Sequence, residues 1–245
     1  MKFKILILAV ILLCAGNVFA DDDEITVVAK KSVAVASTPT YRDSGSGSFS
    51  STVSPVVTKP ASTADGDLII VWFASDTEHA FSSLIGGWTQ IGATVGVGTD
   101  SSLTVVYKFA SAEGATWTFT DLFAATEGGN YGVLVYDKVN ASTPFDVASL
   151  QDAETASATP ATDAITPTSN NCLIVSVWGF DLVAGVTVAP DDSPACTERV
   201  ESNTAGFGAV YGEEHLQTTA AAEAHSITIS ESDTSFWTIM ALRPE

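Results

Sequence analysis

Histidine is scarce in this chain of 245 residues, and this limits the acid–base chemistry that the chain can perform. There are three histidines, and imidazole is the side chain best suited to proton transfer near neutral pH. Two of them follow carboxylates and form two groups: Asp76, Glu78 and His79, and Glu213, Glu214 and His215. If the two groups converge at one end of the fold, their carboxylates and imidazoles can bind a divalent cation or flank a sugar.

The alternative is that these residues are solvated side chains in loops. The sequence has no G-x-S-x-G nucleophile elbow, no H-E-x-x-H zinc motif and no G-x-x-x-x-G-K phosphate loop. We therefore predict no catalytic residues and no cofactor. A weak calcium site is the one metal site that the acidic residues suggest. The third histidine, His225, lies in an alternating segment outside both groups.

The cysteines bear on the compartment of the protein. Cys172 and Cys196 are the two that remain if Cys14 lies in a cleaved leader. In an oxidising compartment such a pair predicts a disulfide, which would stabilise the fold by about 3 kcal/mol. The alternative is two separate buried thiols.

Residues 1–20 have the pattern of a secretion signal. Lys2 and Lys4 precede an almost purely apolar stretch over residues 5–15, and Ala20 ends the segment just before three aspartates. An uncleaved anchor is disfavoured because the stretch is shorter than the ~20 residues that span a bilayer. Lipidation at Cys14 is disfavoured because Leu13 precedes it. We predict a secreted protein without a transmembrane segment in its mature form.

The charge of the chain excludes one class of partner. Ten Lys and Arg stand against 29 Asp and Glu, so the formal charge is −19. Removing Lys2 and Lys4 with the leader leaves −21. Such a chain is not a nucleic-acid binder of the ordinary basic kind. Because 46% of the residues are apolar, we expect the carboxylates to form an acidic surface over a packed core. This surface indicates no particular active site, and calcium bridging between such surfaces is the special use that it favours most.

Strand chemistry runs through the mature chain. Residues 68–74, 103–109, 116–120 and 131–136 are rich in β-branched and aromatic side chains, with turn residues between them. The continuously apolar segment 68–74 predicts a central strand. Segment 116–120 alternates and predicts a strand with one solvent-exposed face. No stretch has the 3.6-residue periodicity of a helix.

The second half of the chain repeats the first in weak form. The half-repeats cover about residues 61–140 and 165–245. Four pairs of segments correspond: 66–76 with 171–181, 103–107 with 206–211, 116–120 with 225–229, and 130–137 with 235–242. The pattern predicts an all-β fold, a two-sheet antiparallel sandwich of jelly-roll type in which the halves interleave or pack together. Two separate small sandwiches are the alternative, disfavoured because each would have a small core.

Short motifs in residues 55–245 resemble a family of all-β modules of secreted bacterial proteins and phage structural proteins. The motifs are Gly66-Asp67-Leu68-Ile69-Ile70, Gly87-Trp88-Thr89-Gln90-Ile91, Val106-Tyr107-Lys108, Thr143-Pro144-Phe145-Asp146 and Ala241-Leu242-Arg243-Pro244. The resemblance implies a non-catalytic sandwich used for display, attachment or decoration. The chain departs from the pattern where Ala195-Cys196-Thr197 replaces a second Gly-Trp-Thr, so a disulfide can replace tryptophan packing there.

The region before the sandwich, residues 21–54, has two parts. Residues 25–36 predict either a first strand or an arm that pairs with another chain, and residues 37–51 are rich in Ser and Gly and predict a flexible connection.

The tryptophans divide into two kinds. Trp72, Trp178 and Trp237 lie in apolar runs and are expected in the core. Trp117 is the candidate for an exposed platform that stacks on sugars, although Phe119 shares its face and that face can equally be the buried one.

Two functions follow from the sequence. The favoured one is a secreted, non-catalytic sandwich that attaches to or decorates the surface of a cell or a virion. The other is an extracellular glycan-binding module or a hydrolase acting on glycans. The corresponding partners are surface or virion proteins, polysaccharide, or further copies of the chain.

Overall fold

Every regular element that the structure describes is a β-strand. The computed structural model describes residues 37–75, 84, 86–97, 101–123, 125–181, 187–190, 194–203 and 208–245. The strands are β1 (Thr40–Thr52), β2 (Val56–Thr58), β3 (Leu68–Ser75), β4 (Thr89–Val97), β5 (Ser101–Phe109), β6 (Thr116–Thr118), β7 (Glu127–Asp137), β8 (Leu150–Ser157), β9 (Cys172–Phe180), β10 (Val188–Pro190), β11 (Thr197–Asn203), β12 (Ala209–Gln217), β13 (Ile227–Ile229) and β14 (Asp233–Leu242). The all-β prediction is confirmed.

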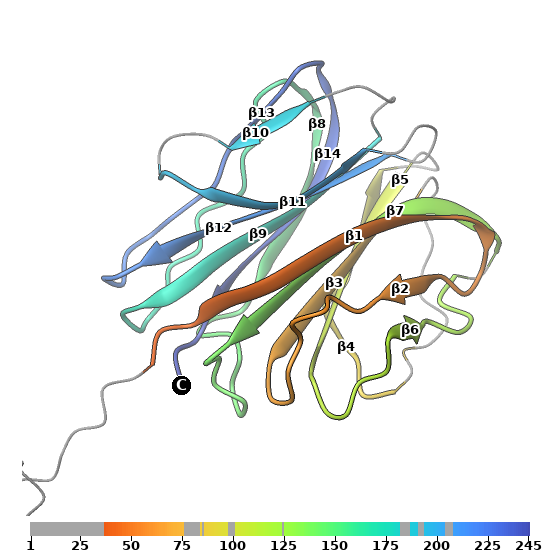
Figure 1. Cartoon of the computed structure of the whole chain (residues 1–245). Coiled ribbons are helices and arrows are strands. Elements are labelled where there is room, and N and C mark those ends of the chain that lie inside the picture. The colour runs from red at the N-terminus through yellow and green to blue at the C-terminus, as the bar shows by residue number, and fades with distance from the viewer. Residues whose placement is uncertain are drawn as a thin grey trace, which may run out of the picture. The chain divides into compact units, whose positions relative to one another are not determined.

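Two five-stranded antiparallel sheets pack face to face. The first has the order β1-β7-β3-β5-β4, and the second has the order β8-β14-β9-β12-β11. Figure 1 shows the first sheet in orange to green and the second in teal to blue. The predicted two-sheet antiparallel sandwich is confirmed. The halves do not interleave, because each half of the chain builds one whole sheet.

The two sheets share one connectivity, which gives the internal repeat a structural form. Strands β1, β3, β4, β5 and β7 correspond in position to β8, β9, β11, β12 and β14. The short strand β6, which precedes β7, likewise corresponds to β13, which precedes β14. Even the turn before the central strand is shared: Gly66 has φ 90° and Asn171 has φ 61°, and glycine and asparagine are the residues that tolerate this left-handed backbone best.

The main core lies between the sheets. Trp72 of β3 is fully buried, and its Nε1 donates a hydrogen bond to the backbone oxygen of Trp178 on β9, 3.2 Å away. The indole of Trp72 packs against Gly132 and Gly212, one from each sheet. Trp72, Trp178 and Trp237 are at most 3% exposed, which confirms their predicted place in the core.

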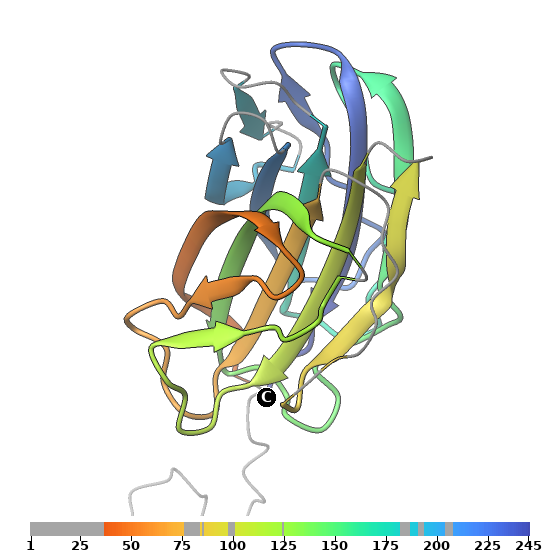
Figure 2. The same cartoon turned by 90° about the vertical axis from the view of Figure 1, so that its right-hand side faces the viewer.

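A two-stranded ribbon covers the outer face of each sheet. β2 pairs with β6 over the first sheet, in front of it in Figure 2, and β10 pairs with β13 over the second. β3 is therefore buried on both faces: Leu68, Ile70 and Trp72 face the other sheet, and Ile69, Val71 and Phe73 face the ribbon. This explains the continuously apolar segment 68–74 and confirms its central position.

The prediction that residues 37–51 form a flexible connection is wrong. β1 pairs with β7 from Thr40 to Thr52, with bulges near both ends. A ladder of backbone hydrogen bonds needs no apolar side chains, and small residues let neighbours approach. A Cβ on Gly47 would lie 2.5 Å from the Tyr131 hydroxyl oxygen. Residues 1–36, which include the predicted leader and the predicted strand 25–36, lie outside the described residues.

Candidate functional site

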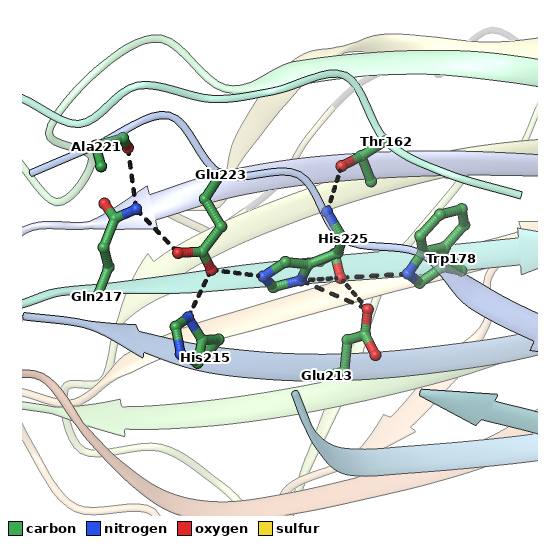
Figure 3. Close-up of polar contacts among 9 residues, drawn as sticks. Thr162, Trp178, Glu213, His215, Gln217, Ala221, Glu223 and His225 are labelled. Atoms are coloured by element: carbon green, nitrogen blue, oxygen red, sulfur yellow. Dashed lines mark hydrogen bonds and ion pairs between the residues drawn. The ribbon is translucent and has the colours of Figure 1, made fainter. Parts of the chain in front are cut away.

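A cluster of polar side chains lies on the outer face of the second sheet, beneath the covering segment. Ser176 of β9 and Glu213 of β12 face each other as a cross-strand pair. The segment before β13 passes over them and adds Glu223 and His225 (Figure 3). Ser176, Glu213 and His225 are at most 1% exposed. We refer to seven residues as the His225 cluster: Ser176, Cys196, Glu213, His215, Gln217, Glu223 and His225.

The ring of His225 is held at both nitrogens. Nδ1 lies 2.8 Å from Ser176 Oγ and 3.5 Å from Glu213 Oε1, and Nε2 lies 3.1 Å from Glu223 Oε1. Ser176 Oγ donates its single proton to Glu213 Oε1 at 3.0 Å, so it accepts the proton of Nδ1. Both ring nitrogens therefore act as donors, which is the pattern of an imidazolium.

Glu223 is fixed by partners on both of its oxygens. His215 Nδ1 lies 2.7 Å from Oε1, and Gln217 Nε2 donates to Oε2 at 2.9 Å. Burial raises the pKa of Glu223, but the hydrogen bonds from His225 and His215 outweigh this effect and the pKa is lowered. The carboxylate is therefore ionised and oriented before any ligand binds.

Cys196, just before β11, completes the cluster. One ligand atom each of Cys196, Glu213 and His225 lie within 4.8 Å of one another. Burial raises the pKa of the Cys196 thiol, although the hydrogen bond with His225 opposes this. Burial lowers the pKa of His225, but hydrogen bonds to Cys196, Glu213 and Glu223 outweigh it and raise the pKa to about 11.

The first half of the chain shows what this position needs for folding alone. In the alignment of residues 66–76 with 171–181, Val71 is the equivalent of Ser176. The cross-strand partner of Val71 is Val106, just as the partner of Ser176 is Glu213, so Val106 is the equivalent of Glu213. Val71 and Val106 are fully buried and belong to an apolar core. The fold therefore accepts two valines where the second half buries a carboxylate and a hydroxyl. Burying a carboxylate costs several kcal/mol unless it is compensated, so its presence points to a function.

The sequence-predicted group Glu213, Glu214 and His215 does not act as one unit. The three residues are consecutive in β12, so their side chains alternate between the faces of the sheet. Glu213 and His215 belong to the His225 cluster, whereas Glu214 forms an ion pair with Arg199, 2.6 Å away, on the face toward the first sheet. The other predicted group, Asp76, Glu78 and His79, lies outside the described residues.

The predicted disulfide is not formed, and both cysteines are free thiols. Cys172 is buried at the start of β9, where its sulfur contacts the backbone oxygen of Ser169 at 3.3 Å. Cys196 instead lies beside Glu213 and His225. The reason is topological: Cys172 begins the central strand β9, whereas Cys196 precedes the edge strand β11, and β12 lies between these strands.

Trp117 is not an exposed platform. It is 6% exposed and packs edge-on against Trp88, with ring centroids 5.5 Å apart. Its Nε1 donates to Glu113 Oε2 at 2.6 Å. The face that Trp117 shares with Phe119 is the buried face of β6, and the wet face carries Thr116 and Thr118. The exposed large apolar side chains of the described residues are Val56 and Leu216, neither of them aromatic.

An open groove of about 590 Å³ borders the cluster. It is lined by Pro194 and by residues 215–219 and 221–224. His215, Gln217 and Glu223 of the His225 cluster line it, and the other lining residues are proline, leucine, threonine and alanine. Ser176, Glu213 and His225 are not among the lining residues.

Comparisons with protein-family models, curated proteins and solved structures found no match for this chain. Fold and site thus define the class: an all-β sandwich of two similar sheets, with a buried polar cluster in the second. No helix within the described ranges is long and apolar enough to cross a membrane.

Sequence reasoning missed Ser176, Cys196, Glu223 and His225 as members of one site. A signal was present in the repeat itself. Where one copy has Val71, the other has Ser176, and the polar residues Glu213, His215 and Gln217 alternate along one strand face.

Proposed function

We propose that this chain is a secreted, non-catalytic β-sandwich module that attaches to or decorates the surface of a cell or a virion. One observation carries the proposal: three central residues of the His225 cluster are enclosed. Ser176, Glu213 and His225 are at most 1% exposed and do not line the neighbouring groove. A substrate in that groove would not meet them, so the arrangement suits a stable scaffold better than turnover.

Further features of the chain support an attachment module. Ribbons cover the outer faces of both sheets, so turns and edge strands remain for contact with a partner. Its formal charge of −19 favours solubility outside the cell and repels anionic polymers. The motifs that resemble secreted and phage modules are turn and core residues of this sandwich.

Fractionation of a culture that produces the protein tests this proposal. We expect the chain, with a mass that begins at Asp21, in the envelope or particle fraction, and we expect mild denaturant to release it. Free protein in the supernatant with no surface affinity would contradict the attachment role, and a mass that begins at Met1 would contradict secretion by a cleaved leader.

The groove beside His215 and Glu223 favours one second candidate, an extracellular glycan-binding module or glycan-acting hydrolase. A glycan array and a hydrolysis screen separate it from attachment. Turnover that is lost in Glu223→Gln but kept in Glu113→Gln, a carboxylate of the other half, would establish an enzyme. Reproducible binding without turnover, reduced by a bulky Ala222→Trp substitution in the groove, would establish a glycan-binding module.

A further inference from the structure

Three kinds of zinc ligand meet in the His225 cluster. Thiolate sulfur, imidazole nitrogen and carboxylate oxygen are the donors that zinc uses in proteins. Here they come from three separate parts of the chain: Cys196 before β11, Glu213 within β12 and His225 before β13. We propose that Cys196, Glu213 and His225 bind one zinc ion.

The spacing of the donors fits tetrahedral coordination. Zinc binds nitrogen and oxygen at about 2.0–2.1 Å and sulfur at about 2.3 Å, so two such donors at corners of a tetrahedron lie roughly 3.3 Å apart. His225 Nδ1 and Glu213 Oε1 are 3.5 Å apart. The sulfur of Cys196 lies within 4.8 Å of the ligand atoms of both. A small movement of the partly exposed Cys196 side chain brings its sulfur to bonding distance of the same ion, and the fourth position goes to water or to Ser176 Oγ.

The second layer of contacts is the one that metal-binding histidines usually have. Such a histidine binds the metal through one nitrogen and gives the proton of the other to a carboxylate. Nε2 of His225 faces Glu223 at 3.1 Å and leaves Nδ1 for the metal. His215 and Gln217 in turn fix Glu223. The ligand is thus oriented before the metal arrives.

The cluster holds the negative charge that a bound cation needs. Glu213 and Glu223 are both buried beside the Cys196 thiol, and His215 and His225 are the imidazoles that face them. Arg199, the nearby guanidinium, is paired with Glu214 on the opposite face of the sheet. On binding, zinc displaces the proton of His225 Nδ1 and the thiol proton of Cys196, and both protons pass to the buffer. The two positive charges of the ion replace these two protons, so binding leaves the net charge of the cluster unchanged.

The first half of the chain is an internal reference for this site. It builds the same sheet with Val71 and Val106 in place of Ser176 and Glu213. The sheet therefore folds without a carboxylate at this position, and the second half adds one beside a histidine and a thiol. The inference is independent of the surface-attachment proposal.

Zinc binding is tested on the purified protein after treatment with reductant and chelator. Native mass spectrometry with added Zn²⁺ should show one ion per chain. Co²⁺ in place of Zn²⁺ should give the absorption bands of a tetrahedral site together with a thiolate-to-cobalt charge-transfer band. Cys196→Ser should abolish that charge-transfer band, and the matched control Cys172→Ser should keep it. Glu223→Gln should weaken zinc affinity by about 10–100-fold.

The outcomes separate binding from folding. Cys196 is partly exposed and Cys172 is buried, so with chelator present we expect Cys196→Ser to unfold at a temperature no lower than that of Cys172→Ser. Added zinc should then raise the unfolding temperature of Cys172→Ser more than that of Cys196→Ser. Absence of bound zinc at micromolar free metal, or equal binding by both cysteine variants, would overturn the proposal.

Discussion

The contact between Glu213 and His225 gives the most direct test of how the cluster is held together. Glu213 is fully buried and accepts a hydrogen bond from Ser176 at 3.0 Å, with His225 Nδ1 3.5 Å away. Glu213→Val introduces the residue that the first half has at Val106. Removing one partner of a buried ion pair costs about 3–5 kcal/mol. We expect the lower end, about 3 kcal/mol, because Glu223 still faces the imidazolium at 3.1 Å.

The partner substitution should cost more. His225→Leu leaves two buried carboxylates, Glu213 and Glu223, without this imidazolium between them, and we expect a loss of about 4 kcal/mol. The double variant removes both the carboxylate and its cation. It should therefore lose at least 1.5 kcal/mol less than the sum of the single losses, which is the coupling that contacting residues show.

Urea unfolding with chelator present measures these free energies in the metal-free protein. For a chain of this size, a loss of 3 kcal/mol lowers the unfolding temperature by about 6–12 °C. A control cycle that joins Glu213→Val with Glu113→Gln, in the other half, should be additive within about 0.5 kcal/mol. Additive losses for Glu213→Val and His225→Leu would refute the coupling, and a Glu213→Val variant as stable as the parent would refute the structural importance of the buried carboxylate.

Three further predictions concern residues outside that contact. Asp146 accepts hydrogen bonds from Thr168 and Ser169. Burial raises the pKa of Asp146, but these hydrogen bonds outweigh burial and the pKa is lowered. The carboxylate therefore stabilises the fold above its unfolded-state pKa, and this stabilisation is lost as the pH falls through its folded-state pKa. Asp146→Asn should then cost about 1 kcal/mol in urea unfolding at pH 7 and nothing at a pH below the folded pKa. Gly132→Ala would place a Cβ 2.1 Å from Trp72 Cζ2 and should cost about 1–3 kcal/mol in thermal unfolding, whereas Gly45→Ala, whose nearest atom is 3.6 Å away, should stay within about 0.5 kcal/mol. Alkylation of the unfolded protein without reductant should label both Cys172 and Cys196, and a mass lower by two hydrogens with neither labelled would show a disulfide instead.

The fold was predictable because its signals are local. A continuously apolar segment such as 68–74 has to be buried on both faces, and the alternation at 116–120 has to place Trp117 and Phe119 on one side. The strand β1 was not predictable in this way. Its Ser and Gly residues carry no apolar pattern. It is held by backbone pairing with β7 and by contacts with the other sheet, such as the hydrogen bond from Ser44 Oγ to the backbone oxygen of Arg199 in β11.

The site was less predictable because its members are distant in sequence. Glu213, Glu214 and His215 form an obvious group in the sequence, but alternation along β12 sends Glu214 to the other face. Its place is taken by Ser176, Cys196 and Glu223, which come from a neighbouring strand and from two connecting segments. Pairing of β9 with β12 and the path of the covering segment decide which side chains meet.

The divergence of the two halves has one further consequence for the cluster. At the position of His215 the first half has Lys108, which forms an ion pair with Glu113 at 2.6 Å, and Glu113 in turn accepts from Trp117. In the second half His215 pairs with Glu223, which in turn faces His225. Each half thus has a carboxylate between a nitrogen-bearing side chain of the sheet and a ring on the covering segment. What the second half adds is Cys196, Ser176 and Glu213, on the far side of the ring. The shared part is explained by the need to fix the covering segment to the sheet, and the added part, which the first half folds without, is the part that we assign to metal binding.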